Sequence, residues 1–181
     1  MSVLRGLVAG VLDLIDRLSR LMAWLSGLTF LLLSFYITVD TLGRSFGGPY
    51  SGFTDDISAF AMAAAGTWAS AYALQVGAHV RIDLLLPYLP QPLRAWLDQL
   101  AVALAGLLAG LLATYAWDLV AGSWRLGARS ISVLQAPLVI PQSLLAFGLT
   151  MLAVQAAALL LARWLGIHEL GTADDAGRAA T

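Results

Sequence analysis

The sequence predicts an all-α integral membrane protein with four transmembrane helices and an N-terminal amphipathic helix. Four stretches contain no charged residue, and each reaches or approaches the roughly 20 helical residues that cross a hydrocarbon core of about 30 Å. Hydrophobic residues make up 60% of the chain and charged residues 12%, and the mean hydropathy is +0.81, as in membrane proteins. In lipid only helices or closed barrels satisfy their own backbone groups, and these stretches lack the alternation of a barrel. The uncharged stretches are Leu21–Val39, Ile57–Val76, Leu100–Trp117 and Pro137–Ala162.

The chain divides into a helix, a membrane domain and a tail. We place the amphipathic helix at residues 1–20, the four-helix domain at 21–163 and a flexible cytoplasmic tail at 164–181. The connectors are too short to hold a soluble domain, so any soluble partner must be a separate chain. Within the domain, the spans cover about residues 21–43, 56–76, 95–119 and 137–163.

Residues 1–20 predict a separate amphipathic element. Asp13, Asp16, Arg17 and Arg20 recur at helical spacing on one face, where Asp13–Arg17 and Asp16–Arg20 form i,i+4 pairs. Apolar residues take the other faces, so the helix should lie among the lipid headgroups or extend the first span. A solvated lead-in to the first span is the main interpretation, and a docking helix for a partner is the alternative.

Charged residues mark the connection between the first two spans. Asp40 and Arg44 form an i,i+4 pair at the outer end of the first span, which lowers the cost of charges near the membrane boundary. Asp55 and Asp56 open the second span, where negative charge meets the positive end of the helix dipole. Capping is the simple interpretation of this acidic pair, and a surface for a soluble partner is the alternative.

The second span is rich in alanine. Ala61, Ala65 and Ala69 are spaced by four residues, and small residues at this spacing let helices approach closely in lipid. Two interpretations stay open. The alanine row packs inside this bundle, or it contacts another subunit.

A short polar segment closes the second span. It reads Gly77-Ala78-His79-Val80-Arg81-Ile82-Asp83, in which Gly77 can end the helix. His79, Arg81 and Asp83 alternate with apolar residues in an extended or turn segment. We interpret His79 as an interfacial hydrogen-bonding residue, because no second histidine lies nearby to complete a metal site.

Tryptophans mark the ends of the predicted spans. Trp24 lies near the start of the first span, Trp96 and Trp124 flank the third, and Trp164 follows the fourth. The amphipathic indole prefers the membrane–water interface. These side chains are therefore predicted to anchor the helices among membrane lipids.

Arginine placement predicts the topology. With a cytoplasmic N-terminus, seven arginines fall inside and three outside, which follows the positive-inside bias. Both termini of this multi-pass protein are thus predicted to face the cytoplasm. The inner set is Arg5, Arg17, Arg20, Arg81, Arg94, Arg163 and Arg178, and the outer set is Arg44, Arg125 and Arg129.

Missing residue types exclude several functions. The spans contain no histidine, so a membrane haem or metalloprotease site cannot be built, and the chain has no cysteine for a thiolate nucleophile or metal site. The span centres lack charged residues, so no transport site is evident. With a net charge of −1 the chain lacks the basic face that nucleic acid requires. The chain is therefore predicted not to be an enzyme and to need no cofactor of its own.

The order of these features resembles a known family, the small membrane subunit of tripartite ATP-independent periplasmic (TRAP) transporters, or DctQ-type small permease. The resemblance covers about residues 20–163, and its most specific part is the His-x-Arg-x-Asp region of His79, Arg81 and Asp83. Family members usually carry glutamate where this chain has Asp55 and Asp56. The other matching features are Arg44, the small-residue second span, Arg94 in a Pro-containing hairpin, and Ser132, Pro137 and Pro141 before the fourth span.

The resemblance implies a division of labour among three proteins. A large multi-span permease would carry the substrate and sodium sites, and a periplasmic binding protein would deliver an organic acid. The small subunit would hold the permease scaffold in the membrane and help form the docking surface. The substrate determinants would then reside in the other two proteins.

Two other functions are weighed against this one. A small self-contained carrier acting as a homodimer would need an acidic residue deep in a span, and Asp40 is placed too near an end. A membrane enzyme or the anchor subunit of another complex is the third possibility, and the missing histidine and nucleophile constellations disfavour the enzyme.

Overall fold

The computed structural model describes residues 2–48, 51–77, 90–132 and 134–165, and these residues form four helices. In chain order they are α1 (Ser2–Ser45), α2 (Thr54–Gln75), α3 (Gln91–Leu126) and α4 (Val139–Trp164). Each helix is long and apolar enough to cross a membrane. The prediction of an all-α protein with four transmembrane helices is confirmed.

The first helix is one continuous element. α1 runs for 44 residues, about 66 Å at 1.5 Å per residue, which is roughly twice the hydrocarbon thickness. No proline falls within it, so nothing in the sequence forces a break between the amphipathic residues and the first span. Residues 2–20 thus continue into the first span as one helix, which is one of the two predicted arrangements.

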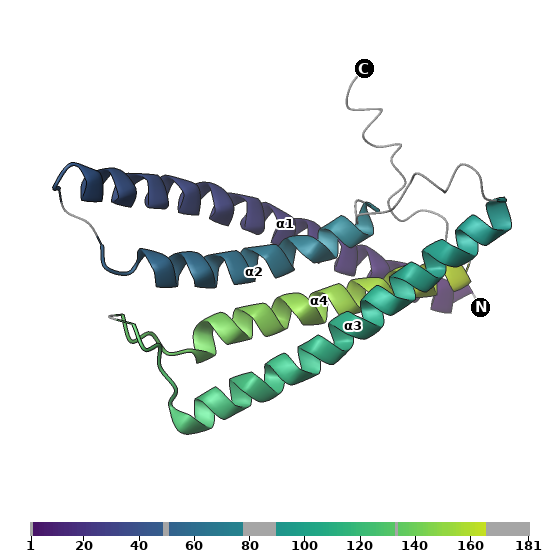
Figure 1. Ribbon diagram of the computed structural model, residues 1–181. Coiled ribbons are helices and arrows are strands. Elements are labelled where there is room, and N and C mark those ends of the chain that lie inside the picture. The colour runs from purple at the N-terminus through teal and green to yellow at the C-terminus, as the bar shows by residue number, and fades with distance from the viewer. Residues whose placement is uncertain (1, 49–50, 78–89, 133, 166–181) are drawn as a thin grey trace, which may run out of the picture.

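The fourth helix joins the bundle together. α4 contacts each of the other three helices, and α1 also packs along α2. The α1–α2 pair and the α3–α4 pair lie close together at the end that holds the N-terminus, and they diverge toward the opposite end (Figure 1). The α1–α2 pair and the α3–α4 pair therefore contact each other mainly through α4.

The core is made of small clusters that all include α4. In one cluster, Leu74 of α2 and Val102 of α3 meet Ala156 and Leu159. Two further clusters bring α1 to α4, and they are Leu12 with Ala158 and Ala162, and Met22 with Ala71 and Met151. Since lipid supplies no hydrophobic force between helices, close packing of such residues has to supply much of the attraction.

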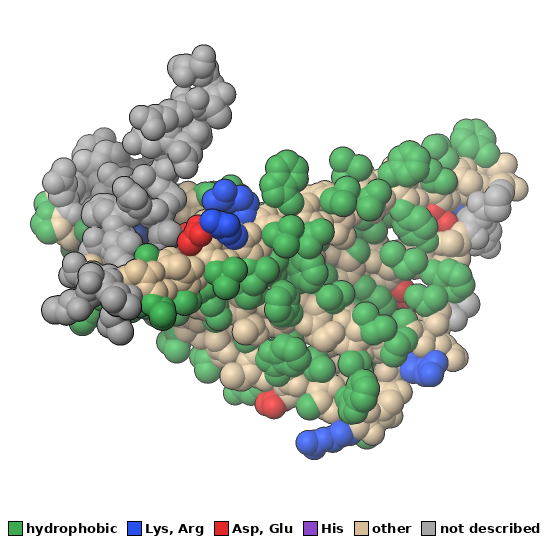
Figure 2. All heavy atoms as spheres, turned by 180° about the vertical axis from the view of Figure 1, so that it is seen from behind, with side chains coloured by type: hydrophobic (Ala, Val, Ile, Leu, Met, Phe, Trp, Pro, Cys, Tyr) green, Lys and Arg blue, Asp and Glu red, His purple; other side chains and the backbone are tan. Residues whose placement is uncertain are grey.

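Most large apolar side chains point outward. Figure 2 shows hydrophobic side chains spread over most of the face that it displays, as expected for a surface that meets lipid acyl chains. The four tryptophans at the predicted span ends are also strongly exposed, in agreement with a position at the membrane interface. Their exposed fractions are 77% for Trp24, 59% for Trp96, 76% for Trp124 and 87% for Trp164.

Two glycines lie at tight helix contacts. A Cβ atom added at Gly148 of α4 would lie 2.7 Å from Thr67 Cβ and 2.8 Å from Trp68 Cδ1 of α2. A Cβ atom at Gly106 of α3 would lie 2.7 Å from the Cβ atom of Ala156. Real Cβ atoms do not approach other atoms so closely, so only glycine allows these helices to meet at this distance. Indole hydrogen bonds reinforce the same contacts, from Trp68 Nε1 to Leu144 O at 2.9 Å and from Trp117 Nε1 to Thr150 Oγ1 at 3.1 Å.

Substituting these glycines should loosen the bundle. We expect Gly148→Ala and Gly106→Ala each to lower the free energy of unfolding by about 1–3 kcal/mol, because the added methyl group overpacks a tight contact. Thermal unfolding of the purified chain in mild detergent measures the effect. Gly66→Ala and Gly110→Ala are the controls, since a Cβ atom meets nothing within 4 Å at either site. Equal behaviour of all four variants would contradict the proposed contacts.

Candidate functional site

Three polar side chains form a buried network between α1 and α4. Ser19 Oγ donates a hydrogen bond to Gln155 Oε1 at 2.8 Å, and Gln155 Nε2 donates one to Asp16 Oδ1 at 2.8 Å. Ser19 and Gln155 are fully buried, and Asp16 is 5% exposed. Buried polar groups cost free energy unless they are hydrogen-bonded, so this network fixes the position of α1 against α4.

The network corrects the predicted solvated face of residues 13–20. Asp13 and Arg17 form the expected exposed ion pair, with 2.8 Å between Oδ2 and Nη2. Asp16, however, is buried and turns to Gln155 instead of lying on a solvated face with Arg20. The available signal was Gln155 itself, a strongly polar residue in an apolar span, which needs a partner in lipid.

The alanine row of α2 packs inside the chain at its centre. Ala65 is 2% exposed, and its carbonyl oxygen accepts a hydrogen bond from Ser26 Oγ of α1 at 2.6 Å. Ala61 and Ala69, one turn to either side, are partly exposed. The position of Ala65 favours the internal interpretation of the row, because α1 already covers it.

Asp40 organises the connection between α1 and α2. Its side chain is buried and accepts a hydrogen bond from the Ser51 backbone nitrogen at 2.6 Å. The predicted pair with Arg44 is present, with 3.2 Å between Nη2 and Oδ2. Ser51 Oγ in turn bonds to Tyr36 Oη and Thr54 Oγ1. Asp40 therefore holds the chain between the helices and is not free to act as a carrier carboxylate.

Asp55 and Asp56 occupy the first turn of α2, where the helix dipole favours negative charge. Phe53 at the helix start has no side-chain oxygen to cap it, so the acids act through charge. Asp56 also accepts a hydrogen bond from Ser132 Oγ in the connection between α3 and α4. Asp55 is exposed. Asp56 thus joins the α1–α2 connection to the α3–α4 connection, and Asp55 is exposed to the surroundings.

The segment after α2 is described only at its beginning. Gly77 adopts a left-handed φ of 68° and its nitrogen bonds to Leu74 O at 3.2 Å, so it ends the helix as predicted. His79, Arg81 and Asp83 lie outside the described residues, as does most of the predicted tail. Within the described part of the chain, His, Asp and Glu side chains form no group of three or more that could hold a metal ion.

The outward face of α1 carries a continuous row of large apolar side chains, which we call the apolar seam. Successive members are alternately four and three residues apart, the heptad pattern of helices that pack along one another. Each member is at least 36% exposed. The pattern was readable from the sequence. The seam consists of Leu7, Val11, Leu14, Leu18, Leu21, Leu25, Leu28, Leu32, Phe35, Val39, Leu42 and, just beyond the helix, Phe46.

The two faces of α1 serve different purposes. Ser26 bonds to α2, whereas Leu28 is two positions further and about 200° around the helix, on the exposed side. The buried side holds the polar network and the contacts to α2 and α4. The apolar seam on the other side stays exposed in the described part of the chain.

This geometry defines a class of protein, a helical membrane protein whose buried polar groups join its own helices. A family model with the description "Tripartite ATP-independent periplasmic transporters, DctQ component" matches residues 33–166, and the chain belongs to this family. It is therefore the small membrane component of a tripartite transporter and not an enzyme. No curated protein and no solved structure matches the chain.

The polar network should contribute measurably to stability. Gln155→Leu leaves the Asp16 carboxylate and the Ser19 hydroxyl buried without their partner, so we expect a loss of about 1–3 kcal/mol in the free energy of unfolding. Replacing Asp16 as well, in Asp16→Leu/Gln155→Leu, should recover part of that loss, because only the Ser19 hydroxyl then remains without its partner.

Thermal and denaturant unfolding of the purified chain test this expectation. Asp13→Asn is the control, because it removes an exposed ion pair that is worth at most about 1 kcal/mol. A Gln155→Leu variant as stable as the unaltered chain would show that the network does not hold α1 to α4.

Proposed function

We propose that this chain is the scaffold subunit of a sodium-driven transporter for an organic acid. It would hold the large multi-span permease in the bacterial inner membrane and help to dock a periplasmic substrate-binding protein. The sodium and substrate sites would lie in the permease. Family membership supports the tripartite arrangement, and the faces of α1 support the scaffold role.

The charges of the chain support a structural role. The acids that lie within helices are engaged in the chain's own contacts where they are buried, Asp16 with Gln155 and Asp40 with Ser51. Neither carboxylate is placed to bind an ion or a substrate in passing. This engagement also disfavours the alternative of a self-contained homodimeric carrier, which needs an available acid deep in the membrane.

The length of the apolar seam carries the proposal. From Leu7 to Leu42 the row extends about 52 Å along α1 at 1.5 Å per residue, or about 49 Å along the membrane normal at an average tilt of about 20°. The whole bilayer with its headgroups is only about 40–45 Å thick. At this tilt the row is longer than the bilayer is thick, so lipid would not cover all of it. A helix of the large permease is the occupant that the heptad pattern fits.

The opposite end of the bundle supports the docking role. If the N-terminus is cytoplasmic, the α1–α2 and α3–α4 connections face the periplasm. Asp55 and Arg129 are exposed there, and Ile131 is fully exposed. A binding protein would meet this surface, whose two connections are joined through Asp56 and Ser132.

Polar substitutions in the seam should weaken the complex. We expect Val11→Gln/Leu14→Gln to reduce the affinity for the co-expressed large permease at least tenfold. A tenfold loss corresponds to about 1.4 kcal/mol of binding free energy, and the double variant removes two apolar contacts. Gly10→Gln is the matched control, because this site directly before Val11 is exposed and open. Co-purification from membranes at equal levels of each variant measures the effect. Unchanged recovery of the permease would refute the assignment. A variant that loses only the association of this chain with a second copy of itself would also refute it.

The topology can be tested with introduced cysteines, since the chain has none. Cysteine at Gly52 should react with a membrane-impermeant maleimide added to intact spheroplasts, and cysteine at Gly10 should react only after the membrane is opened. Both sites leave room for a side chain. The opposite labelling pattern would place the termini in the periplasm.

A further inference from the structure

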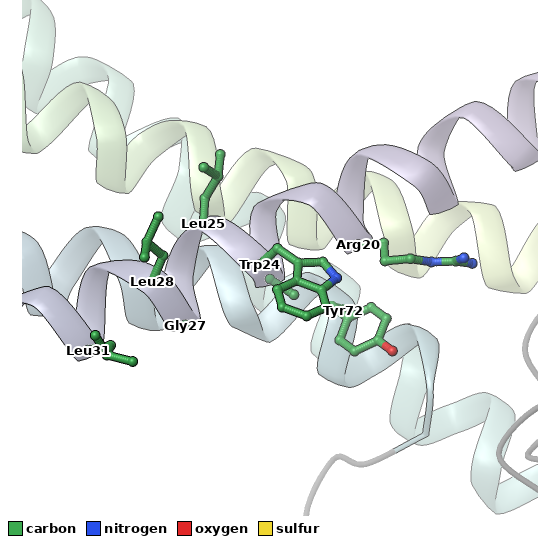
Figure 3. A pocket seen from close by; sticks show the side chains of 8 residues that line it. Arg20, Trp24, Leu25, Gly27, Leu28, Leu31 and Tyr72 are labelled. Carbon is green, nitrogen blue, oxygen red and sulfur yellow. The ribbon is translucent and has the colours of Figure 1, made fainter. Parts of the chain in front are cut away.

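A groove runs along the surface between α1 and α2, next to the apolar seam. Its volume is about 610 Å³, within the range of small-molecule sites. Figure 3 shows Trp24 of α1 and Tyr72 of α2 side by side, with Leu28 and Leu31 further along α1. The α1 residues that line the groove, from Arg20 to Leu31, precede the family match, and Tyr72 lies within it.

The chemistry of the groove changes along its length. At the end nearer the N-terminus is Arg20, which is exposed and whose guanidinium points away from the leucines (Figure 3). The indole of Trp24 and the phenol of Tyr72 come next, followed by the apolar part at Gly27 and Leu31. A ligand that fits this order has an anionic head, a polar joint and an apolar chain. Those are the parts of a phospholipid.

The length of the groove fits one leaflet. Arg20 and Leu31 are 11 residues apart, which is about 16 Å along a helix. Half of a hydrocarbon core of about 30 Å is about 15 Å. Trp24 next to Arg20 also has the position of an interfacial anchor. The groove would thus reach from the headgroups to the middle of the bilayer.

Arg20 is the positively charged residue that lines the groove, and the charged residues near it have contacts of their own. Arg17, three residues earlier, is paired with Asp13. Asp16 interacts with the charge of Arg20, but its Oδ1 atom accepts a hydrogen bond from Gln155 on the buried side of α1. An arginine at the membrane boundary attracts the anionic lipids of the cytoplasmic surface.

The floor of the groove at Gly27 is open. A Cβ atom added there would meet nothing within 4 Å, so the helix leaves space for a ligand's chain beside Leu28 and Leu31. The same observation provides a clean variant, because a larger side chain at Gly27 would fill the groove without disturbing the helix contacts.

We propose that this groove binds one anionic phospholipid, with its phosphate at Arg20 and one acyl chain along Gly27 and Leu31. Trp24 and Tyr72 flank the glycerol region. The assignment to the cytoplasmic leaflet rests on the proposed topology, whereas binding itself does not depend on the proposed transport function. Leu25 and Leu28 belong to both surfaces, so the lipid lies beside the helix that covers the apolar seam.

Binding can be measured on the purified full chain in mild detergent by native mass spectrometry and thermal unfolding. With phosphatidylglycerol we expect one retained lipid and a higher unfolding temperature, and with phosphatidylcholine a clearly smaller effect. Arg20→Gln should lower the affinity for phosphatidylglycerol tenfold or more and so abolish the preference for this lipid. Gly27→Leu should weaken binding of both lipids.

Matched controls keep the test specific. Arg17→Gln removes an exposed arginine that is already paired, and Gly110→Leu adds the same side chain at an open glycine of α3. Both should bind phosphatidylglycerol like the unaltered chain. The proposal is overturned if Arg20→Gln and Gly27→Leu also bind normally, if no preference for the anionic lipid exists, or if inorganic phosphate alone reproduces the stabilisation.

Discussion

The structure depends on how closely α4 approaches its neighbours. In lipid, apolar side chains gain little by leaving one apolar surface for another, so helices associate through tight packing and hydrogen bonds. Gly148 lets α2 approach α4, Gly106 lets α3 approach it, and Gln155 bonds to α1. Each of the three neighbours is thus held to α4 by at least one contact that a larger or apolar residue could not make. This central helix is what keeps the outward faces of the bundle in fixed positions.

The fold follows from the sequence with few ambiguities, because uncharged runs of sufficient length have one physical solution in a membrane. The continuity of α1 did not follow, since amphipathic residues 1–20 are compatible both with a helix on the membrane surface and with an extension of the span. Proline-free sequence permits the extension, and packing of Leu12 against Ala158 and Ala162 stabilises it. Such contacts join residues far apart in the chain and are not visible in local patterns.

The same distinction applies to the candidate sites. The pair of Asp40 and Arg44 was predictable because both residues lie on one helical turn. The burial of Asp16 was not, because its partner Gln155 comes from a helix 139 residues away in sequence. Ala65 shows a third case, in which spacing indicates a packing surface without saying which helix covers it. His79, Arg81 and Asp83, which carry much of the resemblance to the family, lie outside the described residues.

We propose that the surface of α1 has three parts with separate tasks. One side binds α2 and α4. The apolar seam would face a helix of the large permease, and the groove at Arg20 and Tyr72 would receive a lipid. Photo-crosslinking in native membranes tests this division most directly, with a photoreactive residue placed singly at Leu14, Phe35 and, for comparison, Leu107 on the exposed face of α3. We expect crosslinks to the large permease from the two positions in α1 and none from Leu107. Crosslinks from Leu107 alone would contradict this division and assign the docking surface to α3.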